Sequence, residues 1–187
     1  MLTPILIILA VIVAVFIIIV AMRPSDFRVT RSTAVDAPSE GVFEQVNALH
    51  NWEAWSPWAK LDPNAKNTYE GPSAGVGAAF AWSGNSKVGE GRMTIIESRP
   101  NELVRFKLEF VKPFKGTNTA EFTFRPEGRQ TVVQWTMSGK SNFIAKAFGL
   151  FVNCDKMVGG QFEKGLAEMK SLAEAAATTQ QARARAA

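Results

Sequence analysis

The chain has 187 residues, of which 47% are hydrophobic, and it carries a net charge of +4 with one cysteine and one histidine. A single cysteine excludes an intramolecular disulfide. One cysteine and one histidine are also too few to supply the Cys and His ligands of a zinc site. The positive charge is too small, and too scattered among Asp and Glu, to indicate a nucleic-acid partner. No phosphate-binding glycine loop and no spacing typical of a Ser-His-Asp triad is present, so the sequence predicts neither a metal nor a cofactor.

The segment from Ile5 to Met22 is an unbroken apolar run without a charge or a hydroxyl group. As a helix rising about 1.5 Å per residue it spans roughly 27 Å, close to the thickness of a bilayer core. Met1 to Pro4 holds no Lys or Arg, and no pair of small residues at cleavage spacing ends the run. We therefore expect residues 1–22 to be an uncleaved transmembrane anchor, with a cleaved signal peptide as the alternative.

Positive charges follow this run but do not precede it. Arg23, Arg28 and Arg31 lie after Met22, and only the α-amino group lies before. The positive-inside rule then predicts a single-pass protein of an inner (cytoplasmic) membrane with its C-terminal domain in the cytoplasm.

Short elements open the domain that we expect over residues 26–175. Phe27 to Ala34 has strand composition, and the following Asp, Pro and Ser are typical of a helix start. The spacing of Val42, Phe43, Val46 and Leu49 predicts one short helix. Trp52 and Trp55, three residues apart, predict a second helix that ends before Pro57.

From Ala78 onward the apolar period changes to two, as in strands with one buried face. The clearest strand is Leu103 to Val111, where every second residue is apolar and the others are charged or polar at the centre. Short turns separate the strands, so the pattern predicts an antiparallel meander. The further strands are expected over residues 78–82, 89–98, 117–125 and 131–138.

Phe151 to Ala175 has apolar residues at steps of three or four, which predicts a long amphipathic helix. Cys154 falls on the apolar face and is expected to be buried. Gly159, Gly160 and Gly165 each cost about 1 kcal/mol of helix propensity, so we expect a close backbone neighbour or open space beside them. The sheet is expected to curve around this helix, and residues 176–187 are expected to be a disordered tail.

The order of a strand, two short helices, about six more strands and a long helix resembles the helix-grip fold of the START-like superfamily. Two stretches resemble the polyketide cyclase/dehydrase-like SRPBCC branch: the opening with Ala37-Pro38, Val42-Phe43 and Trp55-Ser56-Pro57, and the last helix with Lys156 to Gly159 and Phe162 to Leu166. This resemblance implies an α+β fold with an antiparallel sheet of about seven strands around a C-terminal helix. It also implies an apolar cavity between sheet and helix, in a family that binds lipids, isoprenoids, polyketides or hormones and in which a minority of members catalyse.

The aromatic residues are the strongest indication of a binding site, because they exceed what a small sheet and one helix need for a core. We expect a membrane-anchored domain that binds an apolar or amphipathic small molecule. The alternatives are a cyclase, dehydratase or hydrolase acting on such a ligand, and a protein-interaction module with a vestigial cavity. The apolar segment from Phe143 to Phe151 is expected to form a short helix at the mouth of the fold. The residues expected to contact the ligand are Trp52, Trp55, Phe80, Trp82, Phe106, Phe110, Phe122, Trp135, Phe148 and Phe162.

Overall fold

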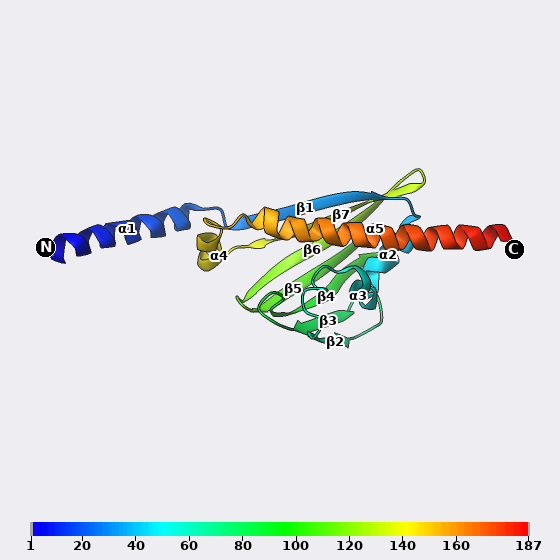
Figure 1. The fold of residues 1–187 in the computed structure, drawn as a ribbon, viewed down its shortest axis with the longest axis horizontal. Helices are drawn as coiled ribbons and strands as arrows, with labels where there is room; N and C mark the ends of the chain where they lie inside the picture. The colour runs from blue at the N-terminus through cyan, green and yellow to red at the C-terminus, as the bar shows by residue number, and fades with distance from the viewer. Residues whose placement is uncertain (1, 187) are drawn as a thin grey trace.

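A seven-stranded antiparallel sheet forms the centre of the computed structural model, which describes residues 2–186. Figure 1 shows the sheet curving under one long helix. The strand order is β1-β7-β6-β5-β4-β3-β2, so only β1 leaves the sequential meander, by pairing with β7. The strands are β1 (Asp26–Val35), β2 (Lys66–Glu70), β3 (Ala79–Ser83), β4 (Glu90–Arg99), β5 (Leu103–Lys112), β6 (Gly116–Glu127) and β7 (Gln130–Lys140).

The alternating pattern of the sequence places the core on the concave face of this sheet. Val104 on β5 pairs with Phe122 on β6, and Phe122 pairs with Trp135 on β7. All three side chains are buried, whereas Arg105 and Glu121, the neighbours of Val104 and Phe122 on their strands, form an ion pair of 2.7 Å on the other face. Because side chains alternate across a strand, this register sends the aromatic rings of three strands to the same side.

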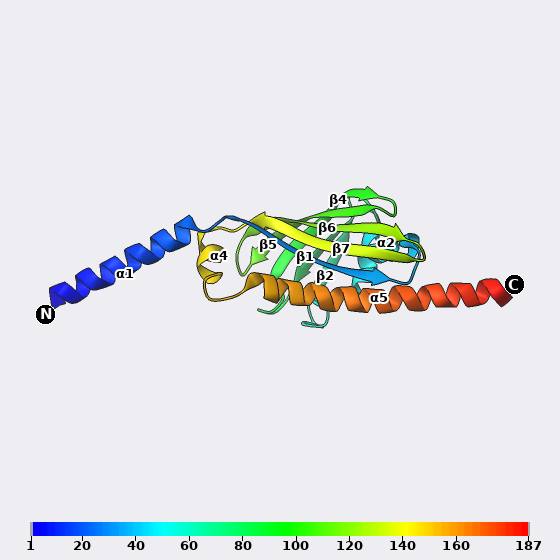
Figure 2. The same cartoon turned by 90° about the horizontal axis from the view of Figure 1, so that it is seen from above.

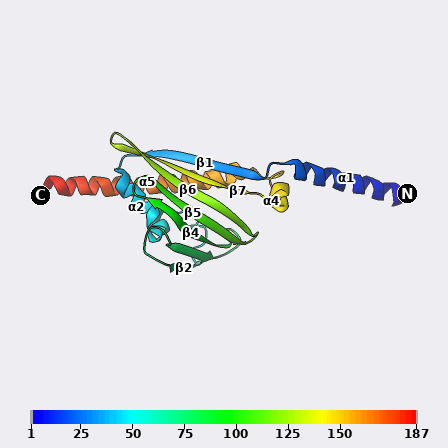
Figure 3. The same cartoon turned by 180° about the vertical axis from the view of Figure 1, so that it is seen from behind.

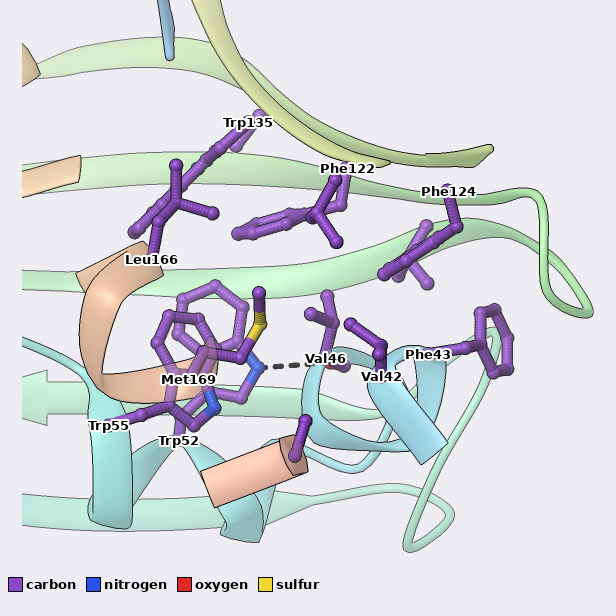
Figure 4. Packing of buried hydrophobic residues seen from close by; sticks show 14 of the residues in the cluster. Val42, Phe43, Val46, Trp52, Trp55, Phe122, Phe124, Trp135, Leu166 and Met169 are labelled. Atoms are coloured by element: carbon purple, nitrogen blue, oxygen red, sulfur yellow. Dashed lines mark hydrogen bonds between the residues drawn. The ribbon is translucent and has the colours of Figure 1, made fainter. Parts of the chain in front are cut away.

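Two helices and a 3-10 turn connect β1 to β2 and close one end of the sheet: α2 (Ser39–Asn47), η1 (Leu49–Asn51) and α3 (Trp52–Trp55). Val42, Phe43 and Val46 of α2 are buried among the core side chains shown in Figure 4. The indole nitrogen of Trp52 donates a hydrogen bond of 2.9 Å to the carbonyl of Val46. This bond fixes the ring of Trp52 against α2, so the two short helices are held as one unit.

The long helix α5 (Cys154–Ala186) crosses the concave face of the sheet, as Figures 1 and 2 show. Asn153 caps its first turn, since its side-chain oxygen accepts from the backbone amide of Lys156 at 3.0 Å. The buried face consists of Phe162, Leu166, Met169, Ala173 and Ala177.

The glycines of α5 meet different surroundings. A Cβ atom at Gly159 would collide with the guanidinium of Arg31, which reaches over the helix from β1. A Cβ at Gly165 would lie 3.0 Å from Pro57 and from Trp135, whereas nothing lies within 4 Å at Gly160. Two of the three glycines therefore permit close approach, and the third faces open space.

The structure differs from the sequence predictions at both ends of α5. Cys154 is exposed, because it begins the helix before the buried face starts. The expected tail, residues 176–187, is helical as far as Ala186, and Ala187 lies outside the described residues. The segment is rich in alanine, the best helix former. It also continues a helix that packing has already nucleated, so each added turn requires little free energy.

The apolar helix α1 (Leu2–Met22) extends away from the domain, and Figure 3 shows it beyond one end of the sheet. Its residues Thr3–Met22 are long and apolar enough to cross a membrane, as those of an anchor or a signal sequence are. The short helix α4 (Phe143–Phe148) lies against its C-terminal end.

Candidate ligand-binding site

A cavity of about 500 Å³ lies between the sheet, α5 and the segment that runs from α3 to β2. Its volume falls within the range of about 300 to 1,000 Å³ that is typical of small-molecule pockets. The wall from the sheet is apolar and includes Met93, Leu108, Ala120 and Met137 besides aromatic rings. Val158 and Phe162, in the N-terminal half of α5, form the opposite wall.

The structure brings most of the predicted contact residues together in this cavity. Trp55 and Phe122 are fully buried in the hydrophobic core and do not line it. Phe148 lies on α4, where it is half exposed and also outside the lining. The predicted residues that line the cavity are Trp52, Phe80, Trp82, Phe106, Phe110, Trp135 and Phe162.

Aromatic stacking holds the cavity wall in place. The ring of Trp135 is stacked on Phe162 at a centroid distance of 4.0 Å and on Phe122 at 4.6 Å. Trp58 meets the edge of Trp135 at 5.7 Å. Such contacts add about 0.5–1.5 kcal/mol each to the burial of the rings. These contacts therefore hold the rings of Trp58, Trp135 and Phe162 together as one wall of the cavity.

The polar side chains of the lining all come from residues 53–69. They are Glu53, Ser56, Asp62, Asn67 and Tyr69, on α3, on β2 and in the connection between them. The strands β3 to β7 and helix α5 contribute aliphatic and aromatic side chains to the lining, and their only polar atoms there are the indole nitrogens of Trp82 and Trp135. The cavity thus has one polar side and one apolar side.

Tyr69 and Glu53 form the main polar pair. The Tyr69 hydroxyl donates a hydrogen bond of 2.7 Å to a carboxylate oxygen of Glu53, and His50 stacks on the Tyr69 ring at 3.7 Å. Burial and this hydrogen bond raise the pKa of Tyr69 above its ordinary value of 10.0. The hydroxyl therefore stays protonated at neutral pH and acts as a hydrogen-bond donor.

Asp62, on the same polar side of the cavity, links two segments of the chain. Its two carboxylate oxygens accept from the backbone amides of Asn64 at 3.2 Å and Asn85 at 2.7 Å, which ties the connection before β2 to the turn after β3. Within residues 2–186, no group of three or more His, Cys, Asp or Glu side chains is placed to hold a metal ion.

The sequence did not predict the polar side of the cavity, because β2 lacks the alternation of apolar and polar residues that indicates a strand. Tyr69 is the one residue of this strand that is partly buried, and the other four are exposed. The pairing of Tyr69 with Phe80 on β3 depends on the register and could not be derived from the sequence. The available signal was the single tyrosine of the chain, placed between a tryptophan-rich stretch and the first clear strand.

Comparison with solved structures gives the same fold in proteins of low sequence identity. A protein from Nitrosospira multiformis matches with a TM-score of 0.58 and 21% identity over 79% of this chain and 96% of its own. Ginseng major latex-like protein 151 from Panax ginseng matches with a TM-score of 0.55 and 12% identity, over 79% and 97% of the two chains. At these identities the likeness concerns the fold, which is the helix-grip fold.

The di-domain ARO/CYC StfQ from the steffimycin biosynthetic pathway has a TM-score of 0.59 and 12% identity to this chain. The match covers 82% of this chain and 52% of StfQ, so the chain spans about half of that two-domain protein. No protein with a curated description matches the sequence significantly. Residues 26–174 match the polyketide cyclase/dehydrase and lipid transport family, and because this is most of the chain, the protein belongs to that family.

Proposed function

We propose that the protein is a membrane-anchored binding protein for an amphipathic small molecule such as a lipid, an isoprenoid or a polyketide-like compound. The observation that carries this proposal is the cavity of about 500 Å³, with its apolar wall and its single polar side. Membership of a family described by polyketide chemistry and lipid transport supports the same class of ligand.

Because one side of the cavity is polar and the other is apolar, an amphipathic ligand should bind in one orientation. Its apolar body lies against the rings of Phe106, Trp135 and Phe162, where transfer from water gains about 25 cal/mol per Å² of buried apolar surface. Its polar end lies toward Tyr69 and Glu53, which offer a hydroxyl and a carboxylate. These two groups hydrogen-bond to each other, and the Tyr69 hydroxyl oxygen and the Glu53 carboxylate keep further acceptor capacity for a polar group of the ligand, so an amphipathic compound is favoured.

Helix α1 supports the anchoring part of the proposal. Val20 is its only buried residue among those described, and the core of the domain starts at Val29. The helix therefore contributes almost nothing to the folded core, and its apolar surface needs another environment. With Arg23 and Arg28 just after the span, we infer that the domain lies in the cytoplasm. A reporter enzyme fused after Ala187 should be active only on the cytoplasmic side.

The Tyr69–Glu53 pair also favours a second candidate function, that of a cyclase or dehydratase acting on the bound compound. A hydrogen-bonded pair of titratable groups at a cavity is the usual place to look for acid–base chemistry. General acid catalysis works best when the pKa of the acid lies near the working pH, and the pKa of Tyr69 moves away from it. We therefore place binding ahead of catalysis, and binding in an open cavity ahead of a protein-interaction module.

Tryptophan fluorescence gives a direct test. Trp52, Trp58, Trp82 and Trp135 line the cavity, so a bound brominated fatty acid should quench most of the emission of the chain. The measurement is a titration of the full-length protein in nanodiscs with brominated fatty acids, followed by competition with unlabelled isoprenoids, sterols and polyketide-like compounds. Quenching that fails to saturate, and a protein that extracts without any bound small molecule, would contradict the proposal.

One pair of matched variants makes this test specific for the cavity. Ala120→Phe adds a ring to the lining and should abolish saturable quenching, because the ring occupies the volume that the ligand needs. Ala167→Phe makes the same change on the exposed face of α5 and should leave binding unchanged. Equal loss in both variants would place the ligand outside the cavity.

A further inference from the structure

Large apolar side chains are exposed together at the end of the domain that meets α1. The exposed fractions are 55% for Ile144 and 48% for Phe148, which share a face of α4 at a spacing of four residues. The backbone amide of Phe151 donates to the carbonyl of Phe148 at 3.0 Å, so this turn carries Phe151 next to that face with 82% of its surface exposed. We call these residues, with Phe143, the α4 face.

Contacts with α1 fix the position of this face. Val20 is fully buried at the end of α1, where α4 packs, and the Lys146 ammonium contacts the carbonyl of Ala21 at 3.4 Å. Figures 1 and 2 show α4 beside the C-terminal end of α1 in both views. If α1 spans a bilayer, residues 20–23 lie at its boundary, and the α4 face lies at the depth of the headgroups.

The charges around the α4 face complement an anionic surface. A hollow beside α4, between the residues that follow α1 and the connection from α4 to α5, is lined by Arg23 and Lys146 and by no acidic side chain. Lys156, in the first turn of α5, is exposed, and the neighbouring Asp155 is occupied by an ion pair of 2.9 Å with Arg31. Basic residues next to an inserted apolar face add about 1 kcal/mol each on a membrane with anionic lipids.

We propose that the α4 face is a membrane-docking surface that inserts Ile144, Phe148 and Phe151 into the headgroup layer of an anionic bilayer. This inference rests on the anchoring part of the proposed function. Val158 of the cavity wall lies about one turn into α5, seven residues after Phe151. Docking therefore holds one wall of the cavity close to the lipids from which an amphipathic ligand would enter.

Depth-dependent quenching in reconstituted vesicles tests the docking surface. The full-length protein with Cys154→Ser receives one probe site at a time, Phe148→Cys or Phe151→Cys, labelled with an environment-sensitive fluorophore. The vesicles contain phosphatidylcholine and phosphatidylglycerol with a nitroxide-labelled lipid. Val76→Cys is the matched control, because Val76 is apolar and its exposure of 59% lies between those of Phe148 and Phe151, but it lies by the C-terminal end of α2, at the other end of the domain. All these sites are exposed, so the substitutions should leave the fold intact.

We expect several-fold stronger quenching at positions 148 and 151 than at position 76. The double variant Arg23→Gln and Lys146→Gln should reduce the quenching in vesicles with phosphatidylglycerol and not in vesicles of phosphatidylcholine alone. A probe at Ile12→Cys reports on α1 in the same preparation. Quenching at position 12 without quenching at 148 and 151 overturns the docking surface and leaves the anchor standing, whereas no quenching at any position overturns both.

Tryptophan quenching by brominated fatty acid in the same samples separates this inference from the binding proposal. If ligand binding persists in a protein whose positions 148 and 151 are not quenched, the docking surface is wrong and the binding function stands. If both probes are quenched and no ligand binds, the docking surface is correct and the binding proposal fails.

Discussion

Phe162 on α5 lies flat on Trp135 of β7, with ring centroids 4.0 Å apart and an angle of 10° between the planes. The two residues join the helix to β7, the strand beside the edge strand β1, and both also line the cavity. The same contact therefore holds the fold together and forms the wall against which a ligand would pack.

Phe162→Ala should lower the free energy of unfolding by roughly 3–5 kcal/mol, because it removes a fully buried ring and leaves a void beside Trp135. Lys164→Ala, two residues further on the exposed face, should change stability by no more than about 0.5 kcal/mol. Chemical denaturation of the two variants checks this. Similar losses at both positions would mean that α5 does not pack as described.

Substitution of two glycines of α5 by alanine should change the stability of the protein in opposite directions. Gly160→Ala should stabilise the protein by about 0.5–1 kcal/mol, because alanine favours helix and the added methyl meets no neighbour. Gly165→Ala should destabilise it by roughly 1–3 kcal/mol, since the methyl would press on the rings of Pro57 and Trp135 at 3.0 Å. Denaturation midpoints measure both, and stabilisation by both changes would contradict the close approach at Gly165.

The elements with a strong apolar period were predictable from the sequence. The alternation of Val104 and Phe106 predicted β5, and steps of three or four residues predicted the buried face of α5 with Phe162 and Leu166. Both patterns follow from the geometry of the backbone, since a buried face repeats every two residues in a strand and every 3.6 in a helix. The helix-grip arrangement then followed from the order of these elements.

The polar side of the cavity depends on tertiary contacts that leave no local pattern. Tyr69 lies on an edge strand that is mostly exposed, and its partner Glu53 lies 16 residues earlier on a one-turn helix. For Phe148 the prediction failed in the opposite way. Its hydrophobicity predicted a contact with the ligand, but it lies on α4, which packs beside α1, and it does not line the cavity. Hydrophobicity alone does not distinguish a side chain that faces a cavity from one on the outside of the fold.

Stability should depend on pH through the contact of Arg31 with α5. The hydrogen bond from Arg31 lowers the pKa of Asp155 below its usual 3.8, so folding favours the ionised carboxylate. A lowered pKa gives stabilisation that is present above about pH 4 and is lost as the pH falls through the folded-state value. The melting temperature of Arg31→Met should therefore lie below that of the unmodified protein at neutral pH, and the two should converge in acid.

Arg28→Met is the control for this pH dependence, because Arg28 is an exposed arginine of the same strand. Its melting temperature should follow that of the unmodified protein at every pH. A constant difference between Arg31→Met and the unmodified protein down to about pH 3 would mean that the Asp155 carboxylate does not contribute.

The anchor can be weakened by one charge. Ile12→Arg places a cation at the centre of α1 and should cost about 2.5–3.5 kcal/mol of membrane insertion. Less of the variant than of the unmodified protein should remain in membranes after carbonate washing. Ile12→Leu serves as the control and should insert normally. Recovery of a mature protein that starts near Ser25 would show that α1 is a cleaved signal instead.

The polar side of the cavity should determine which ligands are preferred. Tyr69→Phe removes one hydroxyl and keeps the ring stacked on His50, so the cavity keeps its shape. A ligand with a polar end loses one hydrogen bond, worth about 0.5–1.5 kcal/mol, which is roughly a two- to tenfold loss of affinity. An analogue without that polar end makes no such bond, and its affinity should be unchanged or slightly higher. Competition against a brominated fatty acid, read by tryptophan fluorescence, measures both ligands in both proteins. A uniform loss for the two ligands would indicate that Tyr69 supports the cavity wall rather than recognising the polar end.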